Sequence, residues 1–315
     1  MRARRAPISP RTVFLLMMLV LLGVFVLTRR AQVTAALHAL RDADPATVTA
    51  ALLASAATIP LAAWGLRLAA ADRIPFGTTV AVQLASAFVN RLAPGAVGGV
   101  ALSLRYLRRQ GLPMPVAATT VAVDRITGVL AVALLLPVLL PFARGSGHHL
   151  LAATVRRGPT LLLAAAVTLL VVAVLLAVPR LRARVRTARR QAVTALRSLA
   201  RSGRVLRLLG ASAALTLTYA GALWLSLLAV GLQAEAALLA PVVLVSVVGE
   251  GVASAAPTPG GLGATEAALV SGLLLYGVPV DTAVAGVLVY RLATFWLPVL
   301  PGYLALRVLV RRQVI

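Results

Sequence analysis

Six ionisable side chains lie in or beside the longest apolar runs of the sequence, and they are the main candidates for chemistry. They are Arg91, Asp124, Arg125, Glu250, Glu266 and Arg291. If these runs span a membrane, each group costs about 2.5 to 3.5 kcal/mol to insert, so it should face a partner or a wet cavity. An arginine binds phosphate through its planar fork of donors, and a carboxyl in a dry site can take up a proton. These residue types indicate binding of a charged group.

The apolar stretch 78–89 is stopped by Asn90, Arg91 and Pro94, so Arg91 stands next to broken backbone at Pro94 and Gly95. Its guanidinium could therefore meet a phosphate next to opened backbone. Snorkelling to a membrane interface, or capping of the broken helix, would explain the same residue.

Asp124 and Arg125 are neighbours on an expected helix, where adjacent side chains point about 100° apart and pair poorly. Each must find another partner. Arg125 and Arg291 hold matching places in two similar stretches of the chain. We expect each to tie its helix to a broken hairpin, with Glu250 or Glu266 as partner; a purely structural ion pair is the alternative.

Glu266 opens a half-helix after the sequence PTPGGLG. Exposed N–H groups and the helix dipole favour a carboxylate at such a place. Capping alone would explain this residue, and uptake of a proton or cation is the functional alternative.

The sequence does not favour enzymatic catalysis. Cysteine is absent, and we find no Ser/His/Asp arrangement, phosphate-binding loop or dinucleotide fingerprint. His148 and His149 have no carboxylate nearby in sequence, which argues against a metal site. We therefore expect no catalytic residue, no metal and no cofactor.

The composition is that of an integral membrane protein. Hydrophobic residues make up 60% of the 315 residues and the mean hydropathy is +0.95, whereas soluble domains are roughly 45 to 50% apolar. The net charge of +23 comes from arginine in the segments between apolar runs, as the positive-inside rule predicts. We expect membrane lipids as partners, anionic or aminoacylated phospholipids above all, and no nucleic acid. The composition is also compatible with a homo-oligomer.

One hydrophobic pattern occurs twice, around Asn90 and around Pro257. Pro94-Gly95 matches Pro259-Gly260, and Asp124-Arg125 matches Tyr290-Arg291. Matching breaks in two membrane halves are typical of transporters, because opened backbone supplies polar groups at membrane depth. The expected break residues are Pro94, Gly95, Gly98, Gly99, Pro257, Pro259, Gly260, Gly261 and Gly263.

The apolar runs predict an all-α polytopic fold. The expected helices are 12–28, 47–68, 116–141, 159–178, 208–231 and 281–309, with re-entrant hairpins at 77–107 and 237–277. We divide the chain into a first membrane half (1–178, first repeat about 47–141), a basic, amphipathic cytoplasmic linker (179–207) and a second half (208–315).

The arginines predict the orientation of these segments. With the amino terminus inside, 22 of the 31 arginines fall on the cytoplasmic side, six outside and three within spans. Both termini are then cytoplasmic, in the inner (plasma) membrane. The two hairpins open toward opposite sides, which makes the halves inverted-topology repeats.

Three stretches resemble the lysylphosphatidylglycerol synthase transmembrane region family: FVNRLAPGAVGGVALSLRYLRRQG followed by DRITG, then APTPGGLGATEAAL, and YRLATFWLPVLPGYLALR. The resemblance implies a flippase-like protein that moves lipid between leaflets. In full-length synthases a separate cytoplasmic domain makes the lipid. No such domain follows Ile315, so we do not expect synthase activity.

The resemblance also suggests functional positions. The second-repeat motif of the family falls on Pro259, Gly260, Gly261, Gly263 and Glu266, followed by Tyr290 and Arg291. In the first repeat many relatives have an acidic residue and then an arginine, where this chain has Gly99 and Leu102, with Arg105 one turn further on.

Our hypothesis is translocation of a phospholipid or other polar-headgroup lipid between the two hairpins. The expected substrate-binding residues are Asn90, Arg91, Arg105, Asp124, Arg125, Glu250, Glu266, Tyr290 and Arg291. An ion-coupled transporter of a small polar solute is one alternative. A non-transporting scaffold that recruits a cytoplasmic enzyme through its basic linker is another.

Overall fold

The computed structural model describes residues 43–71, 73–92, 97–142, 203–256 and 258–315. Throughout these ranges the regular structure is helical, which confirms the all-α polytopic class. The expected helices 12–28 and 159–178, most of the basic linker, and Pro94, Gly95 and Pro257 lie outside the described residues.

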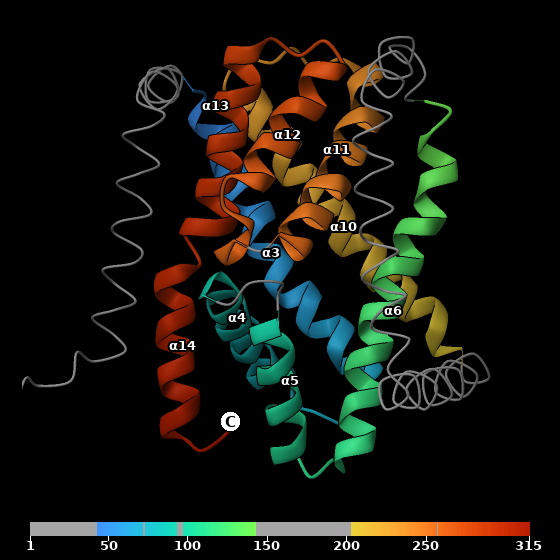
Figure 1. Cartoon of the computed structure of the whole chain (residues 1–315), viewed down its shortest axis with the longest axis vertical. Helices are drawn as coiled ribbons and strands as arrows, with labels where there is room; N and C mark the ends of the chain where they lie inside the picture. The colour runs from blue at the N-terminus through green and yellow to red at the C-terminus, as the bar shows by residue number, and fades with distance from the viewer. Residues whose placement is uncertain (1–42, 72, 93–96, 143–202, 257) are drawn as a thin grey trace, which may run out of the picture.

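Three long helices run the length of the bundle: α3 (Pro45–Ala69), α6 (Met114–Leu139) and α10 (Arg204–Ala229) (Figure 1). Asp44 caps α3 by accepting hydrogen bonds from the backbone N–H groups of Ala46 and Thr47, and Pro45 occupies the first turn, where a missing N–H costs nothing. The apolar runs predicted all three helices to within a few residues at each end.

The first hairpin consists of α4 (Phe76–Leu92) and α5 (Val97–Arg109), both too short to span a bilayer alone. Asn90 and Arg91 belong to the last turn of α4, so the expectation that they stop the helix is wrong by a few residues. The reason is that each of these two side chains hydrogen-bonds a backbone group near the break, as described below, which stabilises an extra turn.

The second hairpin consists of α11 (Ala236–Ala255), the short turn η3 (Pro259–Gly261) and α12 (Ala264–Leu275). By length and hydropathy α11 could cross a bilayer, but the chain turns back at η3. It continues through α13 (Val280–Arg291), a π-helical turn η4 (Leu292–Trp296) and α14 (Val299–Arg311).

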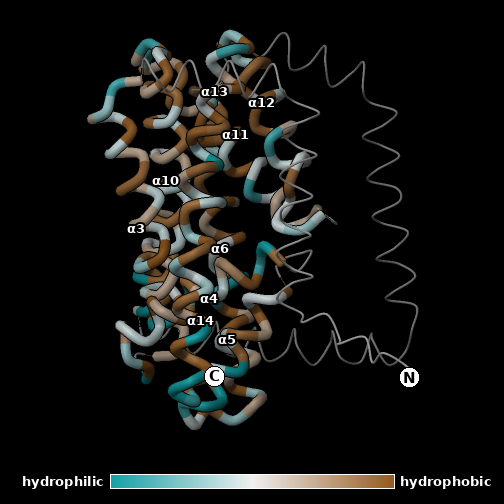
Figure 2. The backbone as a smooth tube through the Cα atoms, turned by 90° about the vertical axis from the view of Figure 1, so that its left-hand side faces the viewer, coloured by the Kyte–Doolittle hydropathy of each residue, from teal (hydrophilic) through white to brown (hydrophobic). Residues whose placement is uncertain are grey.

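The two hairpins occupy opposite ends of the bundle. In Figure 1, α4, α5 and α14 lie in the lower half, whereas α11, α12 and α13 lie in the upper half, and Figure 2 shows the same division from the side. The broken ends of the hairpins therefore meet midway along the bundle. That the halves are related as inverted repeats remains a prediction.

Each end has its own hydrophobic core. The lower core joins α3, α4, α5, α6 and α14 around Tyr106, Leu107 and Leu309. The upper core joins α10, α11, α12 and α13 around Leu223, Leu269 and Val287. Polar groups gather between these two cores, at the level of the hairpin breaks.

Candidate functional site

The junction between α13 and α14 opens the backbone in the middle of the bundle. In the π turn the N–H of Leu297 donates to the carbonyl oxygen of Leu292, five residues back, at 2.9 Å. Pro298 has no N–H to donate to the carbonyl of Thr294, four residues back. Consecutive carbonyl groups are thereby released from the helix and need other donors.

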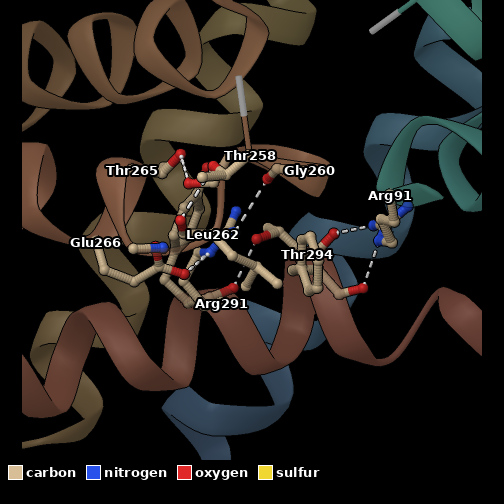
Figure 3. Close-up of polar contacts among 12 residues, drawn as sticks. Arg91, Thr258, Gly260, Leu262, Thr265, Glu266, Arg291 and Thr294 are labelled. Carbon is tan, nitrogen blue, oxygen red and sulfur yellow. Dashed lines mark hydrogen bonds and ion pairs between the residues drawn. The ribbon is translucent and has the colours of Figure 1, made fainter. Parts of the chain in front are cut away.

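Side chains from the first half of the chain supply those donors. Ser55 Oγ of α3 donates to the carbonyl oxygen of Ala293 at 2.9 Å. Arg91 Nη2 donates to Thr294 at 2.5 Å and Arg91 Nε to Phe295 at 2.6 Å (Figure 3). Arg91 Nη1 also donates to Ala87, within α4. Arg91 thus holds the tip of the first hairpin against the α13–α14 junction.

The turn of the second hairpin reaches the same place because of its glycines. Gly260 has a φ of +58°, a conformation that L side chains rarely adopt. A Cβ on Gly260 would clash with the Phe295 ring and lie 3.3 Å from the Cα of Arg91. The turn is closed by Thr258, which donates to Leu262 at 3.1 Å, and by Thr265, which donates to Gly261 at 3.0 Å (Figure 3).

Glu266 and Arg291 form a mostly buried ion pair behind this turn. Arg291 Nε lies 2.7 Å from Glu266 Oε1, with side-chain exposures of 8% and 14%. Glu266 Oε2 accepts the N–H of Gly263 at 2.7 Å, so the carboxylate also caps α12. Arg291 Nη2 reaches the carbonyl of Gly260 at 3.4 Å (Figure 3). The expected tie between Arg291 and the second hairpin is confirmed. Glu266 both caps the start of α12 and forms the ion pair with Arg291.

Glu250 has a different kind of partner. The hydroxyl of Tyr290, on α13, donates to Glu250 Oε1 at 3.0 Å. Arg91, Arg291 and the hydroxyl of Tyr219, on α10, interact with this carboxylate electrostatically. Glu250 is therefore the carboxylate of the junction that is held by a neutral hydroxyl.

The Phe295 ring lies close to both arginines. The guanidinium carbon of Arg291 is 4.4 Å and that of Arg91 is 5.1 Å from the ring centroid, within cation–π range. Phe295 is itself 5% exposed. One aromatic ring thus helps to hold two like charges near each other in an apolar bundle.

Of the remaining expected residues, Asn90 has a structural contact of its own. Its Oδ1 accepts the N–H of Gly99 at 2.6 Å, which joins the two arms of the first hairpin. A Cβ on Gly99 would lie 2.7 Å from the Asn90 amide, so glycine permits this approach. Gly98 precedes it in the first turn of α5.

Arg105 on α5 and Arg125 on α6 are exposed, and neither forms a hydrogen bond or ion pair within the described residues. The expectation that Arg125 ties its helix to a hairpin, as Arg291 does, is wrong within the described residues. The physical reason is that the first hairpin, residues 77–107, contains no Asp or Glu, and Glu266 is already paired with Arg291. Asp124 is half-buried against Gly65 of α3 instead.

Sequence reasoning missed four residues of the junction: Ser55, Tyr219, Thr294 and Phe295. A signal existed for Thr294, because Pro298 stands four residues later and leaves its carbonyl without a helical donor. No comparable local signal marked Ser55 or Tyr219. Across the described ranges, no three His, Cys, Asp or Glu side chains gather as metal ligands.

The fold and this junction define a class: a polytopic α-helical membrane protein with two broken hairpins that meet at a charged centre. The chain belongs to the family described as the lysylphosphatidylglycerol synthase TM region, which matches residues 13–302. This match confirms the resemblance on which the sequence analysis drew. The family description covers the transmembrane part of such synthases. No curated protein matches the chain.

Proposed function

We propose that the protein translocates a polar-headgroup lipid, with phospholipid as the leading substrate class, between the leaflets of a membrane. The observation that carries this proposal is the meeting of two broken hairpins, from opposite ends of the bundle, at a centre with unused N–H donors. Of the five N–H donors on each guanidinium, Arg91 uses three and Arg291 uses two in the described structure. The remaining donors can bind a phosphate oxygen.

The substrate enters this junction by its headgroup while its acyl chains stay among the lipids. Large apolar side chains on α6 and α14, among them Val129, Leu134, Leu300 and Leu304, are 42 to 70% exposed and suit contact with acyl chains. Movement of one hairpin against the other then opens the headgroup site to either side in turn, as in transporters with repeated halves. Arg91 and Arg291 bind the phosphate, and Glu250 and Glu266 balance their charge.

The distribution of charge supports an orientation for this movement. The lower end of the bundle, near the C-terminus, carries exposed arginines at the ends of α5 and α14 and is hydrophilic in Figure 2. They are Arg105, Arg108, Arg109, Arg307, Arg311 and Arg312. The upper end carries the exposed Asp44, Glu235 and Asp281. We therefore assign the lower end to the cytoplasm and the protein to the inner (plasma) membrane, by the positive-inside rule.

The proposal is tested with proteoliposomes that contain a fluorescent phosphatidylglycerol, in which a membrane-impermeant quencher reports the lipid that has changed leaflet. We expect inversion above that of protein-free vesicles, a loss of at least tenfold in Arg291→Gln, and unchanged rates in the matched control Arg108→Gln, an exposed arginine near the end of α5. Absence of lipid inversion together with uptake of a soluble anion would point to a solute transporter. Absence of both activities would overturn transport altogether.

A further inference from the structure

The four ionisable groups at the junction balance one another in number. Arg91 and Arg291 are cationic, and Glu250 and Glu266 are anionic when ionised. An apolar bundle favours such neutrality, because an uncompensated charge is costly where the dielectric constant is low. Any further charge that enters the junction must therefore be compensated.

The two carboxylates are not equivalent in this balance. Both oxygens of Glu266 are engaged, one by Arg291 at 2.7 Å and the other by the N–H of Gly263 at 2.7 Å. Glu250 has one hydrogen bond, from the Tyr290 hydroxyl, and in the described structure its second carboxylate oxygen has none. The described ion pair is that of Glu266, so Glu250 balances the arginines from a distance.

The surroundings of Glu250 come from every helix that packs near it. Arg91 from α4, Tyr219 from α10, and Tyr290 and Arg291 from α13 interact with its carboxylate. The Glu266 carboxylate from α12 faces Arg291. On α6, Arg125 interacts with Tyr219 and with Asp124. Of the two carboxylates at the junction, Glu250 is thus the one that can change its charge without breaking the ion pair seen in the described residues.

We propose that Glu250 is an internal counter-ion that takes up one proton when an anionic headgroup binds to Arg91 and Arg291. This inference rests on the function proposed above. A phosphodiester brings one negative charge, which would leave the junction at minus one if Glu250 stayed ionised. A proton on Glu250 restores neutrality and removes the repulsion between carboxylate and phosphate. The proton comes from the water on the side to which the junction is open, and it is released when the headgroup leaves.

Tyr290 gives this exchange a local mechanism. With Glu250 ionised, the Tyr290 hydroxyl donates its proton to the carboxylate. Once Glu250 is protonated, its own hydroxyl can donate to the Tyr290 oxygen, and the Tyr290 proton is free to turn toward a phosphate oxygen. The headgroup then gains a donor in the same step in which Glu250 loses its charge.

The test measures binding of a water-soluble short-chain phosphatidylglycerol to the full chain in detergent by titration calorimetry between pH 5 and pH 8. Repeating each titration in two buffers of different ionisation enthalpy counts the protons taken up. We expect one proton per lipid in the wild type over the range where Glu250 ionises, and a Kd that rises roughly tenfold per pH unit there. Glu250→Gln mimics the protonated carboxyl and should bind without proton uptake or pH dependence.

The matched control is Glu235→Gln, at the exposed start of the same helix, which should behave as the wild type does. Binding with no proton uptake and a constant Kd in the wild type would overturn the counter-ion role and leave lipid binding intact. Proton uptake that persists in Glu250→Gln would assign the proton to another group and overturn the inference. No binding at any pH, in the wild type or in Glu250→Gln, would overturn the proposed function and this inference together.

Discussion

Arg91 and Phe295 are 204 positions apart in the sequence, yet Arg91 Nε donates to the Phe295 carbonyl oxygen at 2.6 Å. The same guanidinium lies 5.1 Å from the centroid of the Phe295 ring. The Arg91 side chain thus donates a hydrogen bond to a carbonyl group that the π turn releases from the helix, and it also contacts the aromatic ring of the same residue. The end of the first hairpin is fastened in this way to the junction of α13 and α14.

Replacement of Arg91 by alanine should strongly destabilise the fold. Two carbonyl groups, those of Thr294 and Phe295, lose their donor inside the bundle. Buried acceptors left unpaired cost about 1 to 3 kcal/mol each, so we expect a loss of roughly 3 kcal/mol in unfolding by a denaturing detergent. Arg91→Lys should retain only part of this unfolding free energy, because an ammonium group lacks the planar fork that reaches both carbonyl oxygens.

Arg105→Ala is the control for this change, since Arg105 is exposed on α5 and should alter stability by less than about 0.5 kcal/mol. Equal stability of Arg91→Ala and Arg105→Ala would contradict the anchoring role of Arg91.

The Glu266–Arg291 pair should show strong energetic coupling. Because both side chains are largely buried, removal of one partner leaves an uncompensated charge and should cost about 3 to 5 kcal/mol. The double variant Glu266→Gln, Arg291→Gln should cost clearly less than the sum of the two single changes. A double-mutant cycle of unfolding free energies measures this difference, and simple additivity of the two changes would show that the pair is not coupled.

The turn of the second hairpin should depend on two separate properties of glycine. Gly263 has a φ of +80° with nothing within 4 Å of a Cβ, so Gly263→Ala tests backbone strain alone and should cost about 1 to 2 kcal/mol. Gly260→Ala adds the clash with Phe295 to similar strain and should cost more. The measurement is the unfolding free energy of each variant.

Gly221→Ala, within α10 and also without neighbours at 4 Å, serves as the matched control. It should be neutral or stabilising, since alanine is the better helix former by about 1 kcal/mol. If Gly260→Ala were as stable as Gly221→Ala, the close packing of the turn on Phe295 would not exist in the membrane.

The orientation of the bundle can be measured directly, because the chain contains no cysteine. Single cysteines at Arg108 and Arg311 should react with an impermeant maleimide only from the cytoplasmic side. Single cysteines at Glu235 and Asp281 should react only from the opposite side, because their helix ends lie at the other end of the bundle (Figure 1). Labelling of all four from one side would be incompatible with the assigned threading.

The pattern of residues along the chain was sufficient to predict the membrane class, the long helices and the places where hairpins break. These features depend on local properties: hydropathy over about 20 residues, and the inability of Pro and left-handed Gly positions to continue a helix. The capping role of Glu266 was predictable for the same reason, since its partner is the N–H of Gly263, three residues away. The family resemblance was likewise carried by continuous motifs.

The partners of the charged groups were decided only by the tertiary structure. Arg125 and Arg291 hold matching places in the sequence, yet Arg291 is 6% exposed and paired while Arg125 is exposed. Ser55 and Arg91 were brought to carbonyl groups more than 200 positions away. A buried polar group pairs with whichever partner the packing places beside it. Contacts between helices that are distant in the sequence produce no regular spacing of residues from which the partners could be predicted.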